Sequence, residues 1–140
     1  MAACSWRRAA PSPAHDRPAR VTTRATGSRW EDAALAFLAG HGLEAVARNF
    51  NCRYGEIDLI LRDRNSLVFA EVRYRDGTQH GGAAPSVGAA KQARLVKAAS
   101  LYLQAHPQLA SLPCRFDVVG CSGSPAAPQF EWIRGAFEAF

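Results

Sequence analysis

Two short apolar segments each carry a carboxylate where a buried strand ordinarily has none. Asp58 interrupts the segment 55–61, and Glu71 interrupts the segment 67–73. Turn-forming residues separate the segments, which predicts a β-hairpin centred on Arg64 and Asn65. In that register Asp58 lies opposite Glu71.

The hydrophobic pattern favours this register. Successive side chains of a strand point to opposite faces, so one face of the hairpin is wholly apolar and the other carries the charges. The apolar face would hold Ile57, Leu59, Leu61, Val68, Ala70 and Val72. The other face would hold Glu56, Asp58, Ile60, Phe69, Glu71 and Arg73, with Glu56 opposite Arg73. A shift of one residue would mix the two sets.

The facing carboxylates indicate a cation site. Like charges directly opposite each other destabilise a sheet, so the pair Asp58 and Glu71 suggests a cation between them. Carboxylates with water suit Mg²⁺, or Mn²⁺. The alternative is a structural ion-pair network in which Arg73 or Arg53 holds the two acids.

Composition predicts one domain without a membrane span. The chain has 140 residues, of which 48% are hydrophobic, and this allows a real core. No apolar run approaches the roughly 20 residues of a membrane span. The four cysteines form no CxxC pair, which fits reduced thiols in a cytoplasmic protein and makes zinc a poor guess.

The positive charge is concentrated at the N-terminus. Of the net +5, residues 1–26 contribute +4, from five arginines and one aspartate. The remainder is nearly neutral, so the overall charge is no argument for nucleic-acid binding. We expect residues 1–26 to form a disordered basic leader and residues 27–140 to form the folded domain.

The pattern predicts an α/β sandwich with a mixed central sheet and the order α-β-β-β-α-β. Ser28 is the expected N-cap of a helix over 30–39, with Glu31 completing a capping box. A Gly-rich loop is expected at 75–85 and another loop at 122–128. The expected strands are 43–50, 55–61, 67–73 and 115–121, with an edge strand at 129–133, and the second helix is 86–105.

Six ordered motifs over about residues 27–120 carry a family resemblance. The motifs are Gly27…Glu31-Asp32-x-Ala34, Gly42-Leu43…Arg48-Asn49-Phe50, Gly55-Glu56-Ile57-Asp58-Leu59-Ile60, Val68-Phe69-Ala70-Glu71-Val72-Arg73-x-Arg75, Lys91-Gln92-x-x-Leu95…Ala98-Ala99…Tyr102-Leu103 and Arg115-Phe116-Asp117-Val118-Val119. With these motifs the chain resembles the bacterial YraN-like uncharacterised family, and the pattern Asp58…Glu71-x-Arg73 resembles the PD-(D/E)XK nuclease signature. The resemblance implies a restriction-endonuclease-like fold similar to archaeal Holliday junction resolvases.

The resemblance assigns roles residue by residue. Glu31, Asp58 and Glu71 match the metal ligands. The catalytic residues that the resemblance implies are Asp58, Glu71, Arg73 and Gln92. Of these, Arg73 stands where the signature has lysine, and Gln92 matches a polar residue aimed at the site. Each has a simpler reading, because Glu31 can serve only as a capping acid, Arg73 can pair with Glu56, and Gln92 can be a solvated helix residue.

The arginine departs from the nuclease pattern. Arginine does not lose its proton near neutral pH, so Arg73 cannot be a general base, although it can stabilise charge on a phosphate. Cleavage would then need a metal ion to activate the attacking water; otherwise the site binds without cutting.

The resemblance therefore implies a metal-dependent nuclease acting on structured or branched DNA, with Mg²⁺ or Mn²⁺ as the expected cofactor. Lys91, Arg94 and Lys97 are the candidate phosphate contacts, or else a solvated helix face. The alternative function is a non-catalytic nucleic-acid-binding or protein-interaction module on the same fold. DNA is the expected partner, and a homodimer is left open.

Overall fold

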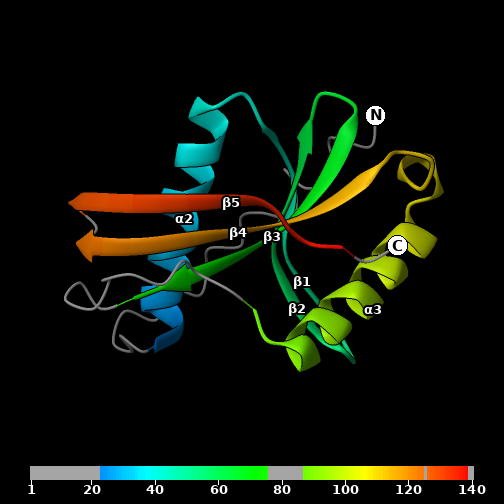
Figure 1. The fold of residues 1–140 in the computed structure, drawn as a ribbon, viewed down its shortest axis with the longest axis horizontal. Helices are drawn as coiled ribbons and strands as arrows, with labels where there is room; N and C mark the ends of the chain where they lie inside the picture. The colour runs from blue at the N-terminus through cyan, green and yellow to red at the C-terminus, as the bar shows by residue number, and fades with distance from the viewer. Residues whose placement is uncertain (1–22, 76–86, 125, 139–140) are drawn as a thin grey trace, which may run out of the picture.

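The hairpin predicted around Arg64 and Asn65 lies at the centre of a five-stranded sheet in a computed structural model of the chain (Figure 1). The structure describes residues 23–75, 87–124 and 126–138. The elements, in chain order, are α2 (Thr23–Gly40), β1 (Glu44–Cys52), β2 (Gly55–Asp63), β3 (Ser66–Tyr74), α3 (Ala89–Ala105), the short 3₁₀ helix η3 (Pro107–Leu109), β4 (Cys114–Ser124) and β5 (Ala127–Phe137).

The sheet is mixed, as predicted. Its strands follow the chain order β1-β2-β3-β4-β5, and only β3 and β4 are parallel. Helix α3 lies in the crossover that a parallel pair requires. The predicted order α-β-β-β-α-β is confirmed, with β5 as an added edge strand.

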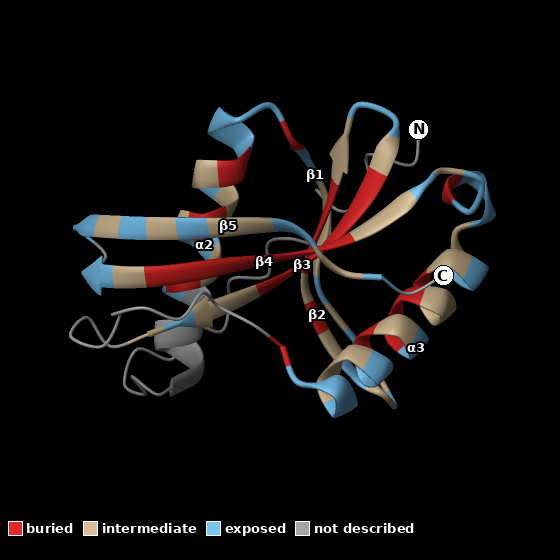
Figure 2. Cartoon of the chain, viewed as in Figure 1, coloured by how far each residue is buried: buried red, intermediate tan, exposed pale blue. Residues whose placement is uncertain are grey.

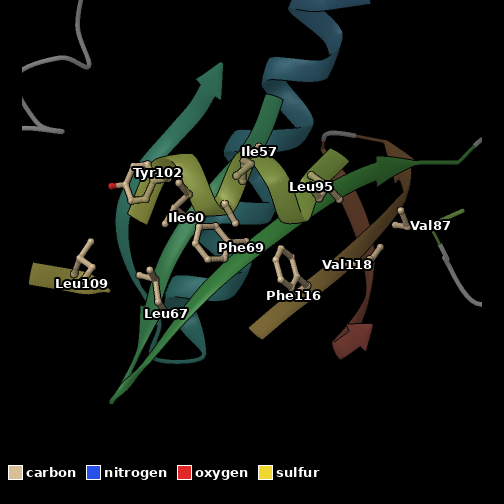
Figure 3. Close-up of a cluster of buried hydrophobic side chains, with 12 residues drawn as sticks. Ile57, Ile60, Leu67, Phe69, Val87, Leu95, Tyr102, Leu109, Phe116 and Val118 are labelled. Atoms are coloured by element: carbon tan, nitrogen blue, oxygen red, sulfur yellow. The ribbon is translucent and has the colours of Figure 1, made fainter. Parts of the chain in front are cut away.

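The two long helices cover opposite faces of the sheet. Alternate residues of β3 show this, because Val68 packs in the cluster of α2 and Phe69 packs in the cluster of α3. Figure 2 shows that the buried residues concentrate in the central strands, whereas β5 is mostly intermediate or exposed. Figure 3 shows the core beneath α3, where Phe69 stacks against Phe116 at a ring distance of 5.4 Å.

The predicted hairpin register is confirmed over its turn-proximal half. Asp63 pairs with Ser66, and the pairing continues in step to Leu59 and Ala70. The predicted apolar face is confirmed except at one residue. Ile57 packs in the cluster of α3, whereas Leu59 packs in the cluster of α2, so the regular alternation of β2 is interrupted at the position between them.

The element boundaries differ from the predicted ones at several places. Helix α2 begins at Thr23, so Ser28 lies inside it and is not the N-cap. Gly27 within this helix costs only about 1 kcal/mol relative to alanine, which is too little to end a helix. Helix α3 begins at Ala89, three residues later than predicted, after the N-cap Gly88.

The predicted loop at 122–128 is largely strand. Strand β4 runs to Ser124 and β5 begins at Ala127, because the two strands form a long hairpin that is paired from Phe116↔Phe137 to Ser124↔Ala127. Two predicted segments lie largely outside the described residues. They are the Gly-rich loop at 75–85, of which only Arg75 is described, and the leader at 1–26, of which residues 1–22 are not described. Within the described residues, no helix is long and apolar enough to cross a membrane.

Candidate functional site

Asp58 lies just beyond the point where the pairing of β2 with β3 ends, opposite a left-handed residue of β1. On one side, the ladder between β2 and β3 ends at Leu59↔Ala70, and the Asp58 carboxylate instead accepts a hydrogen bond of 2.9 Å from the Val72 backbone N–H. On the other side lies Asn49 of β1, in a left-handed conformation with a φ of 53°. The start of β2 and the end of β3 therefore diverge here (Figure 1), which opens the sheet around the acid.

Three further carboxylates act on Asp58. Burial and then the charge of Glu71 raise the pKa of Asp58 from 3.8 to about 8, with smaller contributions from Glu31 and Glu56. The hydrogen bond from Val72 opposes this rise but does not cancel it. We call these four residues, Glu31, Glu56, Asp58 and Glu71, the acidic cluster. The effect of the other three carboxylates on Asp58 shows that negative charge is concentrated here.

Helix α3 supplies a cation to the acidic cluster. Lys91 Nζ lies 2.8 Å from Glu71 Oε2. The Glu71 residue is only 6% exposed, and a buried carboxylate without a partner would be costly. Lys91 was predicted as a phosphate contact, and the structure places it in the candidate site itself.

Asn49 holds two members of the acidic cluster. Its side-chain nitrogen donates hydrogen bonds of 2.9 Å to both Glu31 Oε1 and Glu56 Oε2, which uses both protons of the amide. The Arg48 Nη2 atom lies 3.8 Å from Glu31 Oε1 and 2.8 Å from Asp32 Oδ1. Sequence reasoning missed Asn49, although an Asn within a strand pattern is a signal for left-handed backbone.

Burial raises the pKa of Glu31. The hydrogen bond from Asn49 and the charge of Arg48 oppose this rise. The predicted capping role of Glu31 does not hold, because its helix begins at Thr23.

The donor atoms suit a hard divalent cation only in part. In the described ranges, no three His, Cys, Asp or Glu side chains form a group that could hold a metal ion. Glu71 lies near enough to Asp58 for its charge to raise the pKa of that acid, and Mg²⁺ commonly uses one or two carboxylates with water and substrate phosphate as its other ligands. Among the described residues, Glu31 forms no three-ligand group with these two acids.

A cleft opens beside the acidic cluster. It has a volume of about 190 Å³ and is lined on one side by the start of β2 and on the other by α3. We call it the Tyr54 cleft; its lining residues are Tyr54, Gly55, Glu56, Asp58, Lys91, Arg94, Leu95 and Ala98. Two of the three predicted phosphate contacts, Lys91 and Arg94, therefore border the same space as Asp58.

The remaining predicted site residues are Gln92, Arg73 and Lys97. The Gln92 amide donates a hydrogen bond of 2.8 Å to the Val87 carbonyl, which closes the first turn of α3. Arg73 lies two residues after Glu71 on β3 and is in register with Gly120 of β4. Lys97 lies over the ring of Tyr54.

A fully buried acid elsewhere shows what a structural carboxylate looks like in this fold. Asp117 accepts two hydrogen bonds from Arg115, one from the Trp132 indole and one from the Gly135 backbone. It lies at the register shift between β4 and β5, so it fills a gap in the ladder and is neutralised by arginine. Asp58 fills a similar gap but is surrounded by carboxylates.

The fold and site define an α/β protein with an acidic cluster at an open place in a mixed sheet. The chain belongs to the UPF0102 family: the profile of "Uncharacterised protein family UPF0102" matches residues 30–121. This confirms the YraN-like membership that the motifs predicted.

Relatives match most of the chain. A UPF0102 protein of Xanthomonas oryzae pv. oryzae (strain PXO99A) is 55% identical over 113 residues, which cover 81% of this chain and 91% of that protein. A UPF0102 protein of Stutzerimonas stutzeri (strain A1501) is 47% identical over 117 residues, which cover 84% of this chain and 98% of that protein. The match to the described domain is therefore broad.

Proposed function

We propose that the chain is a metal-dependent nuclease of the PD-(D/E)XK kind that acts on structured or branched DNA. One observation carries the proposal: the charge of Glu71 acts on the Asp58 carboxylate where β2 and β3 diverge, with Lys91 Nζ at 2.8 Å from Glu71 Oε2 and the Tyr54 cleft alongside. Carboxylates beside cations at an open cleft are the elements of phosphodiester chemistry.

The size of the cleft favours a polymer over a small substrate. Sites that enclose a small molecule usually have volumes of roughly 300–1,000 Å³, and the Tyr54 cleft has about 190 Å³. It can admit one phosphate group of a longer chain, with the rest of the nucleic acid lying on the surrounding surface. The exposed side chains of Arg94 and Lys97 on α3 provide the positive charge that a backbone requires.

The bound cation, Lys91 and Arg73 would each have a different role at the phosphate. A bound Mg²⁺ or Mn²⁺ would activate the attacking water and offset the charge of the phosphate. The signature has its lysine on the same strand as the glutamate. In this chain Lys91 of α3 provides a lysine beside Glu71. Glu71 would hold the cation, Lys91 would then contact the phosphate, and Arg73 would remain a fixed charge because it cannot lose its proton.

The test is cleavage of labelled DNA by the purified full-length chain. Junction, flap, single-stranded and duplex substrates are incubated with Mg²⁺, with Mn²⁺ and with EDTA. We expect metal-dependent cleavage that is lost in Asp58→Asn and Glu71→Gln and kept in Glu131→Gln, which changes an exposed acid on β5.

The alternative is a nucleic-acid-binding module without catalysis. The ion pair between Lys91 and Glu71 is the observation that favours it, because a lysine can replace the metal as the counter-ion. Binding of DNA without cleavage under any metal condition would support this alternative. Neither binding nor cleavage would reject both functions.

A further inference from the structure

Tyr54 lies in a tight turn beside the acidic cluster. It lies with Arg53 in the two-residue turn between β1 and β2, across which Cys52 pairs with Gly55. Gly55 has a φ of 135°, which glycine adopts without strain. This tight connection fixes Tyr54 four residues before Asp58, and both residues line the Tyr54 cleft.

The surroundings of the Tyr54 ring are cationic. The Arg53 Cζ atom lies 5.1 Å from the ring centroid, and the Lys97 Nζ atom lies 5.4 Å from it. Both cations belong to exposed residues, and Arg94 lines the same cleft. Neither of the two hydrophobic clusters that the described residues form includes Tyr54, so core packing does not account for the ring at this place.

An aromatic ring among exposed cations at a cleft suits an unpaired nucleotide. Proteins that hold single strands combine an aromatic side chain, on which a base stacks, with cations that follow the backbone. Stacking of a base is worth more than an exposed cation–π contact. A base can therefore displace Arg53 or Lys97 from the ring, and the displaced cation can contact a flanking phosphate.

We propose that Tyr54, with Arg53 and Lys97, binds an unpaired nucleobase next to the phosphate that enters the Tyr54 cleft. The bases of an intact duplex stack on one another, so this platform selects DNA with an unpaired nucleotide beside the scissile position. The inference rests on the proposed function, because it names the substrate class of the same site.

The experiment compares two strands that differ only in their bases. Fluorescence anisotropy in Ca²⁺ measures binding of the full-length chain to a thymidine strand of about 12 nucleotides, within the range of single-strand sites, and to an abasic strand of equal length. We expect the thymidine strand to bind about tenfold more tightly, which is the effect of one stacked base. Tyr54→Leu should reduce this preference to about onefold, and Tyr54→Phe should retain it.

Tyr74 provides the matched control. It is 48% exposed, and its ring centroid lies 4.9 Å from that of Trp30. Tyr74→Leu therefore removes a tyrosine ring that does not line the Tyr54 cleft. This variant should keep the preference for the thymidine strand. A second measurement needs no variant: a strand carrying 5-iodouracil, irradiated on the wild-type chain, should form its cross-link at Tyr54.

The outcomes separate the two proposals. Equal binding of thymidine and abasic strands, a preference that survives Tyr54→Leu, or a cross-link elsewhere would overturn the platform and leave the nuclease proposal standing. A wild-type chain that neither binds nor cuts single-stranded, duplex or branched DNA would overturn both.

Discussion

Lys91 on α3 neutralises Glu71 on β3 across a Nζ–Oε2 distance of 2.8 Å. The two residues come from elements separated by the Gly-rich segment, and their contact closes one side of the acidic cluster. The lysine side chain is 43% exposed, whereas that of Glu71 is 8% exposed. Lys91 can therefore leave the carboxylate for solvent or a phosphate, while Glu71 stays in place.

We expect Lys91→Met to reduce metal-dependent cleavage by about 100-fold, the scale of losing one positioned donor to the transition state. Metal-free stability should fall as well, because Glu71 would remain buried without its cation. Cleavage rates and melting temperatures check both effects. Arg134→Met is the control, since it removes an exposed cation on β5, where Arg134 lies over Trp132 at 4.0 Å. Unchanged cleavage in Lys91→Met would exclude Lys91 from the site.

Asp58→Asn should abolish the pH dependence that this acid gives to stability, because asparagine does not titrate. The folded pKa of Asp58, about 8, lies above its ordinary value of 3.8, so its contribution in EDTA is largest below about pH 4 and is lost as pH rises through about 8. Asparagine resembles the neutral acid and keeps an acceptor for the Val72 N–H. The variant should therefore be more stable than wild type in alkaline buffer.

The same variant tests the metal. Added Mg²⁺ should raise the melting temperature of the wild type, because a ligand that binds only the folded state stabilises it, and it should leave Asp58→Asn unchanged. Melting curves between about pH 5 and pH 9, with and without Mg²⁺, give both results. A variant less stable than wild type at every pH would instead indicate that Asp58 belongs to a structural ion-pair network.

Arg73 separates a phosphate contact from a structural role. Arg73→Lys should keep or raise cleavage, since it restores the usual Glu-x-Lys arrangement. Arg73→Ala should cost on the order of 100-fold in rate with little change in melting temperature. If Arg73 is structural, Arg73→Ala should lower stability and leave DNA affinity intact. A stable Arg73→Ala protein with full activity would remove this residue from the mechanism.

Asp117→Asn should damage stability and leave the site intact. Asp117 is 1% exposed and accepts hydrogen bonds from Arg115, Trp132 and Gly135. Loss of its charge leaves Arg115 with only one of its two carboxylate partners. Breaking a buried pair costs about 3–5 kcal/mol. Arg115 also contacts Asp63 at 3.1 Å, which places the cost at the lower end. Denaturant unfolding measures the loss, and the Mg²⁺ increment in melting temperature should survive.

Local patterns in the amino-acid sequence are enough to predict the elements that depend on neighbouring residues. The alternation of apolar residues and the turn at Arg64 and Asn65 placed the hairpin in its observed register from Asp63↔Ser66 to Leu59↔Ala70, because a shift would exchange its faces. The same pattern singled out Asp58 and Glu71 as misplaced carboxylates. The start of helix α2 is not predicted correctly. Gly27 lies inside this helix, because one glycine costs too little to end a helix that the rest of the segment supports.

The surroundings of the two acids depend on contacts between elements that are far apart in the chain. Lys91, Asn49 and Tyr54 come from α3, β1 and the turn before β2, and their contacts depend on how these elements pack. The divergence of β2 and β3 beyond Leu59 also turned Ile57 to the face of α3. Local periodicity contains no information about such distant contacts, because each is fixed by the packing of both faces of the sheet at once.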